Sequence, residues 1–227
     1  MTTAKAIAKP TVGATRTNTR NVQFENRCQR FVEVAQTLFL ERGFAGTSVN
    51  EVVRRAGGSL ATLYAEFGTK DELFEAVMNR RAAMMFTDII NSKTPVPDIA
   101  NELLQLAKRI QTHMLSEDAL ALYRLAVHEG PKFPSVRNAV LVYGLAGFLR
   151  RLSDYFIVLA ESGQLEIDDP AVAAELFLTL VQGQLRTIAA CGDADRISQK
   201  RRNDHVKRVV EIFLHTYPPR INKIVRK

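Results

Sequence analysis

Hydroxyl groups, small side chains and a cation are concentrated between Ser59 and Lys70, in a stretch that offers little bulk for a hydrophobic core. Ser59, Ala61 and Thr62 would allow the backbone at the start of a helix to approach another molecule closely. Backbone N–H groups at a helix N-terminus and side-chain hydroxyls are donors that suit phosphate oxygens. Tyr64 adds a ring for packing and a further hydroxyl, and Lys70 adds a positive charge. This stretch therefore predicts close contact with bases and phosphates.

Two short amphipathic helices must position these residues. Apolar side chains recur at helical spacing over residues 48–56 and again over 60–67. Gly57 and Gly58 join the two helices, and such a tight joint requires a positive φ, which glycine adopts without steric penalty. Ser59 is the expected N-cap of the second helix. Helices joined in this way form a helix-turn-helix, whose second helix enters a DNA major groove; ordinary helical bundles contain the same geometry.

Two Ser/Thr-x-x-Glu patterns predict capping boxes in this region. Ser48 with Glu51 would open the first short helix, and Thr69 with Glu72 would open a longer helix that follows the second. Lys70 then lies in the first turn of the longer helix, where a positive charge is unfavourable for the helix dipole. A cation at this position makes sense if a phosphate binds beside it.

The rest of the sequence predicts an all-α protein. An amphipathic helix containing Phe31 is expected to end at Gly43, and no run shows sustained β alternation. Further helices are expected over 98–115, 118–129, 134–162, 170–191 and 203–216. The chain thus has a compact N-terminal unit that ends near residue 81, followed by a larger helical domain.

Charge and cysteine content limit the classes of partner. The 227-residue chain has a net charge of +7, and residues 1–30 carry six basic side chains and a single acidic one, Glu25. Such an arm suits contact with the DNA backbone, and a disordered solubilising tail would have the same composition. Cys28 and Cys191 make neither a disulfide framework nor a zinc site. We expect a reducing, cytoplasmic location and no membrane partner, because a secretory signal is lacking and the longest apolar run, 139–149, is too short to span a bilayer.

No motif predicts an enzyme. The four histidines are dispersed, with no spacing that supports a metal. The Gly57-Gly58-Ser59 stretch lacks the lysine of a P-loop, and no Gly-x-Ser-x-Gly is present. We therefore expect no catalytic residues, no metal site and no cofactor.

Five motifs together are far more specific than the glycine spacing alone. They are Arg42-Gly43-Phe44, Gly46-Thr47-Ser48-Val49, Ala56-Gly57, Ser59-Leu-Ala-Thr-Leu-Tyr64 and Phe67-Gly-Thr-Lys-Asp-Glu-Leu73. Over about residues 27–80 the sequence resembles the TetR family of transcriptional regulators. The resemblance implies that Thr47, Ser48, Thr62, Tyr64 and Lys70 contact DNA, mostly its backbone.

Three residues depart from the pattern of that family. Gly58 stands where a small apolar residue is usual, which predicts a looser turn. Leu60 replaces a common polar residue, which removes a possible contact, and Glu66 places a carboxylate where it would repel phosphate. These departures concern the operator sequence and the affinity for DNA rather than the fold.

Two stretches of the second domain, 123–134 and 174–184, resemble the C-terminal domains of the AefR-like subgroup, close to the AcrR-like regulators. That resemblance implies a ligand cavity and a dimer formed largely by the last two long helices. A stripe of mixed polarity over 172–188 suits a partner helix, and an internal core face would look the same. Ligand pockets are mostly apolar with a few orienting polar groups. The candidate ligand contacts with such chemistry are His113, Tyr123, His128, Phe148 and Gln184.

The chain is accordingly divided into a flexible basic arm (1–22), a helix-turn-helix DNA-binding domain (23–81) and a helical ligand-binding and dimerisation domain (82–227). We expect a homodimeric regulator, in the simplest case a repressor, that binds a near-palindromic double-stranded operator. A small, hydrophobic effector would release it from DNA. The alternative is a ligand-binding or protein-interaction module that has lost DNA binding, which Leu60 and Glu66 favour.

Overall fold

The structure is a computed structural model that describes residues 13–89 and 97–220, and every regular element within these ranges is a helix. In chain order they are α1 (Gly13–Gly46), α2 (Val49–Ala56), α3 (Leu60–Phe67), α4 (Lys70–Ile89), α5 (Ile99–Met114), α6 (Glu117–Glu129), α7 (Pro134–Ala139), the π-helix η1 (Val140–Ala146), α8 (Gly147–Glu161), α9 (Pro170–Gln182), α10 (Leu185–Ala190), the 3₁₀-helix η2 (Ala194–Arg196) and α11 (Gln199–Thr216). The all-α prediction is confirmed. Within the described ranges, no helix has the length and apolar content needed to cross a bilayer.

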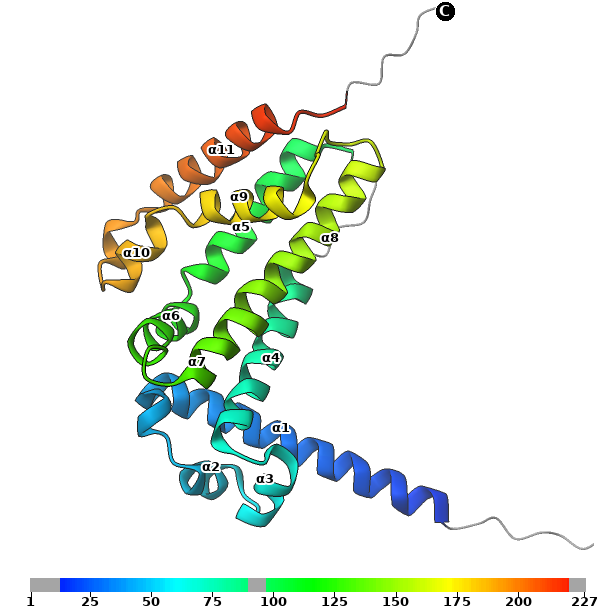
Figure 1. Ribbon diagram of the computed structural model, residues 1–227, viewed down its shortest axis with the longest axis vertical. Coiled ribbons are helices and arrows are strands. Elements are labelled where there is room, and N and C mark those ends of the chain that lie inside the picture. The colour runs from blue at the N-terminus through cyan, green and yellow to red at the C-terminus, as the bar shows by residue number, and fades with distance from the viewer. Residues whose placement is uncertain (1–12, 90–96, 221–227) are drawn as a thin grey trace, which may run out of the picture.

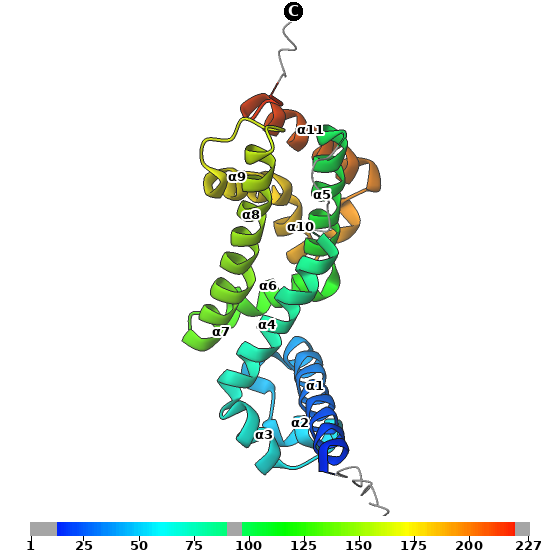
Figure 2. The same cartoon turned by 90° about the vertical axis from the view of Figure 1, so that its right-hand side faces the viewer.

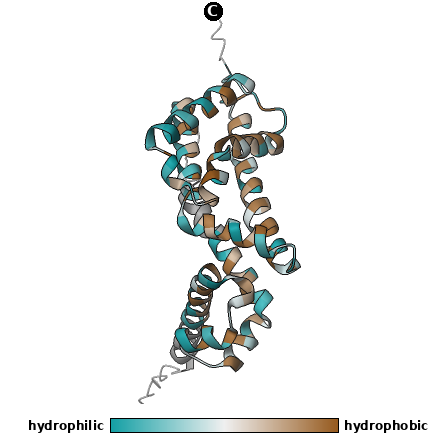
Figure 3. Ribbon diagram, turned by 90° about the vertical axis from the view of Figure 1, so that its left-hand side faces the viewer, coloured by the Kyte–Doolittle hydropathy of each residue, from teal (hydrophilic) through white to brown (hydrophobic). Residues whose placement is uncertain are grey.

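The molecule is elongated, with α1, α2 and α3 at one end and α5, α8, α9 and α11 at the other (Figure 1). Helix α4 leaves the small unit and runs toward the larger one, as the second view also shows (Figure 2). Hydrophobic and hydrophilic residues alternate along the helices of both parts (Figure 3). This is the pattern by which each helix buries one face against its neighbours.

The larger unit is built around aromatic side chains from three helices. Phe156 of α8, Phe177 of α9 and Phe213 of α11 are at most 1% exposed. The ring of Phe213 stacks on that of Phe156 at 5.2 Å between centroids and meets the ring of Phe177 edge-on at 4.9 Å. These contacts fix α8, α9 and α11 relative to one another.

The core of the small unit extends into the second half of the chain. Leu125 of α6 and Val136 of α7 belong to the same buried cluster as Phe39 and Phe74. The rings of Phe44 and Phe133 also meet, with 5.2 Å between their centroids. The helix-turn-helix unit therefore packs directly on α6 and α7. A movement of these two helices would change the packing in the core of that unit.

The start of α1 differs from the prediction of a flexible arm over residues 1–22. The helix begins at Gly13, so residues 13–22 are helical, while residues 1–12 of the predicted arm lie outside the described ranges. No proline interrupts residues 13–22, and each residue added to an existing helix gains a backbone hydrogen bond. Gly43 interrupts α1 with φ 74°, as predicted for its C-terminal end.

Three of the later helices also differ in their bounds. The helix predicted over 134–162 consists of α7, the π-helical turn η1 and α8. The helix predicted over 170–191 is divided at Gly183. A carbonyl group at the end of a helix has no partner within the helix, and here the ring nitrogen of His205 lies 2.9 Å from the carbonyl oxygen of Leu180. The last helix begins at Gln199 rather than at residue 203, because the hydroxyl of Ser198 caps it.

Candidate DNA interface and internal cavity

Helix α3 has one buried face and an exposed N-terminal end. The Oγ of Ser59 accepts a hydrogen bond from the N–H of Thr62 at 3.1 Å, which confirms Ser59 as the N-cap. Leu63 is fully buried and holds the helix on the core, whereas Ser59 and Ala61 are exposed and Thr62 is half-buried. The side chain of Tyr64 is 49% exposed. The residues predicted to contact DNA in this helix thus lie on or near its free surface.

The turn before α3 is tighter than the expectation based on Gly58. Gly57 has φ 74° and Gly58 has φ 129°, both in the range that favours glycine. A Cβ atom at position 58 would lie only 3.0 Å from the ring of Phe31 in α1. The prediction of a looser turn is therefore wrong, because the missing side chain lets the turn approach α1 closely.

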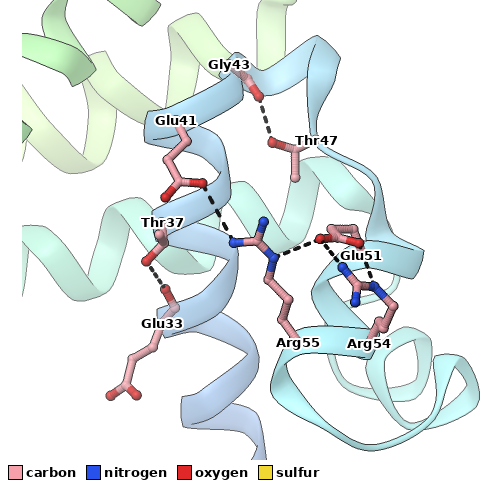
Figure 4. Close-up of polar contacts among 8 residues, drawn as sticks. All are labelled: Glu33, Thr37, Glu41, Gly43, Thr47, Glu51, Arg54 and Arg55. Atoms are coloured by element: carbon pink, nitrogen blue, oxygen red, sulfur yellow. Dashed lines mark hydrogen bonds and ion pairs between the residues drawn. The ribbon is translucent and has the colours of Figure 1, made fainter.

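The predicted capping box of α2 does not form, because Glu51 binds two arginines instead. Ser48 is the N-cap residue but makes no side-chain capping bond. Glu51 accepts hydrogen bonds from Arg54 at 2.8 and 2.6 Å and from Arg55 at 2.8 Å (Figure 4). These hydrogen bonds, that of Arg54 first, lower the pKa of Glu51 to about 2. Arg55 also lies 3.7 Å from Glu41, so the cluster links α2 to α1.

The second predicted capping box forms in part. The Oγ1 of Thr69 accepts a hydrogen bond from the N–H of Glu72 at 3.2 Å, as an N-cap residue does. The carboxylate of Glu72 then accepts from the Thr69 hydroxyl at 2.8 Å, in place of the backbone N–H that a complete box would use. The start of α4 is nevertheless at the predicted position.

Thr47 and Ser48 lie in different environments. Thr47 is 4% exposed, and its hydroxyl donates a hydrogen bond to the carbonyl oxygen of Gly43 at 2.7 Å (Figure 4). Ser48, the next residue, is exposed. The side chain of Thr47 thus holds the turn between α1 and α2, and Ser48 lies on the surface.

Lys70 is half-buried beside a carboxylate that comes from the other part of the molecule. Its Nζ lies 3.4 Å from the carbonyl oxygen of Ala45 and 4.6 Å from the ring centroid of Phe44. Glu129, the last residue of α6, is 9% exposed and accepts a hydrogen bond from the N–H of Ala45 at 2.9 Å. Burial lowers the pKa of Lys70, and the nearby charges of Glu129 and Asp71 oppose that shift.

Glu129 also fits against Gly43. A Cβ at position 43 would overlap the Glu129 carboxylate, so the glycine gives this side chain its place. Sequence reasoning missed Glu129, since its partners are Gly43 and Ala45, which are far away in the chain. The separation between Ala45 and Glu129 is 84 residues.

Two arginines of α1 add positive charge next to the turn before α3. Arg27 and Arg30, together with Asn26, Gly57 and Gly58, line an open hollow. Both arginines are exposed, and neither forms an ion pair with any side chain that the structure describes. The sequence showed them as part of a basic segment, but their position beside Gly57 and Gly58 depends on the packing of α1 against the turn.

The larger unit and α4 form a partly open cavity of about 140 Å³. Its walls come from α4, α5, α6, η1, α8, α9 and α10 and are mostly apolar. Three of the five predicted ligand contacts, His113, Tyr123 and Phe148, line it. His128 is exposed in the last turn of α6, and Gln184 borders a different, open hollow with Lys200 and Asp204.

Arg186 of α10 lines the same cavity and was not predicted. Its guanidinium carbon lies 4.0 Å from the ring centroid of Tyr123, and its Nη1 donates a hydrogen bond to Gln182 at 3.2 Å. Burial lowers the pKa of Arg186. Arg81, the other arginine in the wall, forms an ion pair with Asp118 at 3.0 Å.

These features define a helix-turn-helix protein with a second helical domain that contains a cavity. Residues 31–77 match bacterial regulatory proteins of the tetR family, and residues 101–219 match the C-terminal domain of AefR-like transcriptional repressors. The second match alone covers more than half of the chain, and the chain belongs to the TetR family of transcriptional regulators.

Proteins similar to this chain are transcriptional regulators rather than enzymes. The repressor AcnR of Corynebacterium diphtheriae is 25% identical over 184 residues, which is 79% of this chain and 90% of that protein. A TetR-family regulator from Mesorhizobium loti has a similar structure, with a TM-score of 0.77, 25% identity and coverage of 86% of this chain and 98% of that one. The flavonoid-responsive regulator FrrA has a TM-score of 0.72 and 26% identity, covering 85% and 97% of the two chains.

Proposed function

We propose that the protein is a homodimeric transcriptional repressor that binds a near-palindromic operator and is released by a small, largely hydrophobic effector. The observation that carries the proposal is α3, with a buried anchor at Leu63 and an exposed N-terminal end at Ser59 and Ala61. Such an end fits the major groove, where small residues allow close approach. In a dimer, the two α3 helices would lie roughly 34 Å apart or a multiple of this distance, to read successive grooves.

The residues around α3 fit contacts with the DNA backbone. Ser48 and Tyr64 offer exposed hydroxyls, and Lys70 offers a cation in the first turn of α4. Arg27 and Arg30 extend this surface along α1 on the other side of the turn. Thr47, whose hydroxyl is bound to Gly43, would position Ser48 instead of contacting phosphate through its side chain. Thr62, next to the N-cap, is the residue that we expect to influence base preference.

Exposed apolar side chains support α8 and α9 as the dimer interface. They are Leu141 and Val142 of η1, Ile157 and Val158 of α8, and Val172 and Leu176 of α9. Exposed apolar side chains on neighbouring helices, as α8 is to both η1 and α9, are typical of sites of protein association. In contrast, Val181 of the predicted stripe and Val206 and Phe213 of α11 are buried within the chain. The interface that we propose is therefore formed by η1, α8 and α9, and it includes the exposed part of the predicted stripe at Val172 and Leu176 but not α11.

Glu129 supports a route by which the cavity affects the DNA-binding unit. Helix α6 contributes Leu122 and Tyr123 to the cavity wall and ends at Glu129. The carboxylate of Glu129 binds the N–H of Ala45, near the C-terminal end of α1, and lies near Lys70. A ligand that shifts α6 would move a negative charge relative to Lys70 and Ala45. It can shift the balance between two states only by its differential affinity for them.

The structural similarity to FrrA, a flavonoid-responsive regulator, favours an aromatic effector. The walls of the cavity include Phe148 and Tyr123, whose rings suit such a ligand.

The alternative function, a module without DNA binding, rests on Leu60 and Glu66, and both are exposed on α3. Fluorescence anisotropy with DNA from the promoter of its own or a neighbouring operon tests the two readings. A repressor should lose affinity steeply as salt rises from 50 to 200 mM, because DNA binding releases counterions. Affinity that stays flat over this range would exclude phosphate neutralisation and leave the alternative.

Variants of the predicted contacts refine the test. Lys70→Ala and Tyr64→Phe should weaken binding to all DNA sequences by similar factors, since phosphate contacts carry no sequence information. Thr62→Ala should change the relative affinities for operators that differ in base sequence. An unchanged operator profile would remove Thr62 from base recognition.

A further inference from the structure

We propose that the effector is a small aromatic acid, whose ring occupies the cavity and whose carboxylate pairs with Arg186. The inference rests on the proposed function, since it names the chemical class of the ligand that binds this cavity. It goes beyond a merely hydrophobic effector because it requires a negative charge at a defined place.

The size and walls of the cavity fit a single aromatic ring. Its volume is about 140 Å³, and an apolar cavity of about 150 Å³ in another protein holds benzene. Met78 of α4, Ile110 of α5 and Phe148 of α8 provide apolar surface from three different helices. A ring in this space would bury its faces against carbon atoms, and binding would be driven by removal of apolar surface from water.

Arg186 gives this apolar space a positive charge without a matching carboxylate. Among the described residues, no Asp or Glu lies within ion-pair distance of its guanidinium, and its one side-chain hydrogen bond goes to the neutral amide of Gln182. Arg81, in the same wall, is paired with Asp118. A buried charge is unfavourable unless it is paired. Of the two arginines that the described residues place in this wall, the half-buried Arg186 is thus the one whose charge a ligand can neutralise.

The guanidinium is also held in a fixed orientation. It stacks on the ring of Tyr123 at 4.0 Å, and the bond to Gln182 uses one of its five N–H donors. A planar guanidinium pairs with a carboxylate through two parallel hydrogen bonds, which gives direction as well as affinity. The lowered pKa of Arg186 agrees with a desolvated position, in which such a pair is stronger than in water. His113 and Gln182, which line the same cavity, add groups that can select ring substituents.

Matched pairs of acids and amides test the inference directly. We would measure binding of benzoate, phenylacetate and 4-hydroxybenzoate to the full-length protein by calorimetry, each beside its neutral primary amide. At least one acid should bind roughly 10- to 100-fold more tightly than its amide, as expected for a charge-assisted hydrogen-bonded pair. If no acid of the panel exceeds its amide, the inference is overturned.

Variants assign the preference to Arg186. Arg186→Gln should remove the preference for acid over amide while leaving affinity for the amide nearly unchanged, and Arg186→Lys should retain part of it. Arg208→Gln removes the same charge from an exposed position on α11 and should preserve the preference. Circular dichroism would confirm that each variant is folded. An acid preference that persists in folded Arg186→Gln would also overturn the inference.

DNA binding is measured separately, so that the two proposals fail independently. Salt-dependent operator binding combined with no acid preference would remove only the aromatic acid. Acid preference without operator binding would leave the ligand class standing and remove the repressor. Under both proposals together, the acid that binds best should release operator DNA from the wild-type protein and have much less effect on Arg186→Gln.

Discussion

The arginines of the two units lie in opposite environments. Arg27 and Arg30 project from α1 into solvent beside the turn, whereas Arg186 lies in the wall of an apolar cavity against Tyr123. An exposed charge keeps its water and acts through a field that salt screens within about 8 to 10 Å. A desolvated charge interacts strongly, but only with a partner that reaches it in the right geometry. The first environment suits attraction to a long polyanion, and the second suits selection of one small molecule.

Glu129 lies between these two environments. It ends the helix that carries Tyr123, and its carboxylate binds the N–H of Ala45 near Lys70. A carboxylate therefore lies near a cation where the two units meet.

Removing the exposed arginines should have the largest effect on DNA binding. In Arg27→Ala/Arg30→Ala, the proposed dimer would lose four positive charges, so the slope of log K against log salt should become shallower by about 3 to 4. Affinity for DNA should fall on the order of 10²- to 10³-fold near 0.1 M salt. Fluorescence anisotropy over a salt series measures both quantities. Lys207→Ala/Arg208→Ala removes equal charge from α11, and a similar loss in this control would mean that net charge, not the position of Arg27 and Arg30, explains the effect.

The next largest effect is expected from substitutions in the turn before α3, and it concerns the free energy of unfolding. Gly58→Ala would place an alanine at a φ of 129°, with its Cβ only 3.0 Å from the ring of Phe31. Because both the backbone and this contact would be strained, the free energy of unfolding should fall by about 2 to 3 kcal/mol. Gly57→Ala has φ 74° with no atom within 4 Å of the new Cβ, and should lower it by only about 1 kcal/mol. Urea denaturation of both variants gives the comparison. Equal losses would show that the contact with Phe31 does not tighten the turn.

Much of the small unit could be predicted because its determinants are local. The N-cap at Ser59 and the positive φ angles of Gly57 and Gly58 depend on residues within one turn of each other. The capping box at Ser48 failed for a local reason too, since Arg54 and Arg55 compete for the carboxylate of Glu51. Charged donors make stronger hydrogen bonds to a carboxylate than a backbone N–H does.

The cavity and the contact of Glu129 with α1 depend on residues that are distant in the sequence, and no local pattern encodes them. Glu129 meets Ala45 across 84 residues. Arg186 meets Tyr123 only because α10 packs on α6. His113, Tyr123 and Phe148 were found by residue type and general location, and the same criteria also selected His128 and Gln184, which lie outside the cavity wall. Packing between helices decides which of several suitable side chains share one space.

Neutralising Glu129 should have a smaller effect, and one of opposite sign to the loss of Arg27 and Arg30. Glu129→Gln keeps an acceptor for the Ala45 N–H but removes the negative charge near Lys70. The affinity for operator DNA should therefore rise roughly 2- to 5-fold, because two charges in a partly solvated site interact with an energy on the order of 1 kcal/mol. In a Lys70→Ala background the same change should have little effect, and this double-mutant cycle isolates the interaction. Glu117→Gln, in the first turn of the same helix, is the control. An equal rise in both backgrounds would mean that Glu129 acts on DNA without Lys70.

The smallest effect is expected on stability at low pH and concerns Glu51. Hydrogen bonds from Arg54 and Arg55, and not a capping bond, stabilise the charged form of its carboxylate. Its pKa in the folded protein is about 2, below the ordinary value of 4.5. The unfolded chain therefore binds this proton at a higher pH than the folded one, so the stabilisation from Glu51 is present above pH 4.5 and is lost as pH falls toward 2. Urea denaturation at pH 7, 4.5 and 3 should show a slightly weaker loss of stability in Glu51→Gln than in the wild type. Because exposed ion pairs contribute little, the difference should be small, and Glu66→Gln on the surface of α3 serves as the control. A pH dependence identical in wild type and Glu51→Gln would show that the arginine cluster does not hold this carboxylate in its charged form.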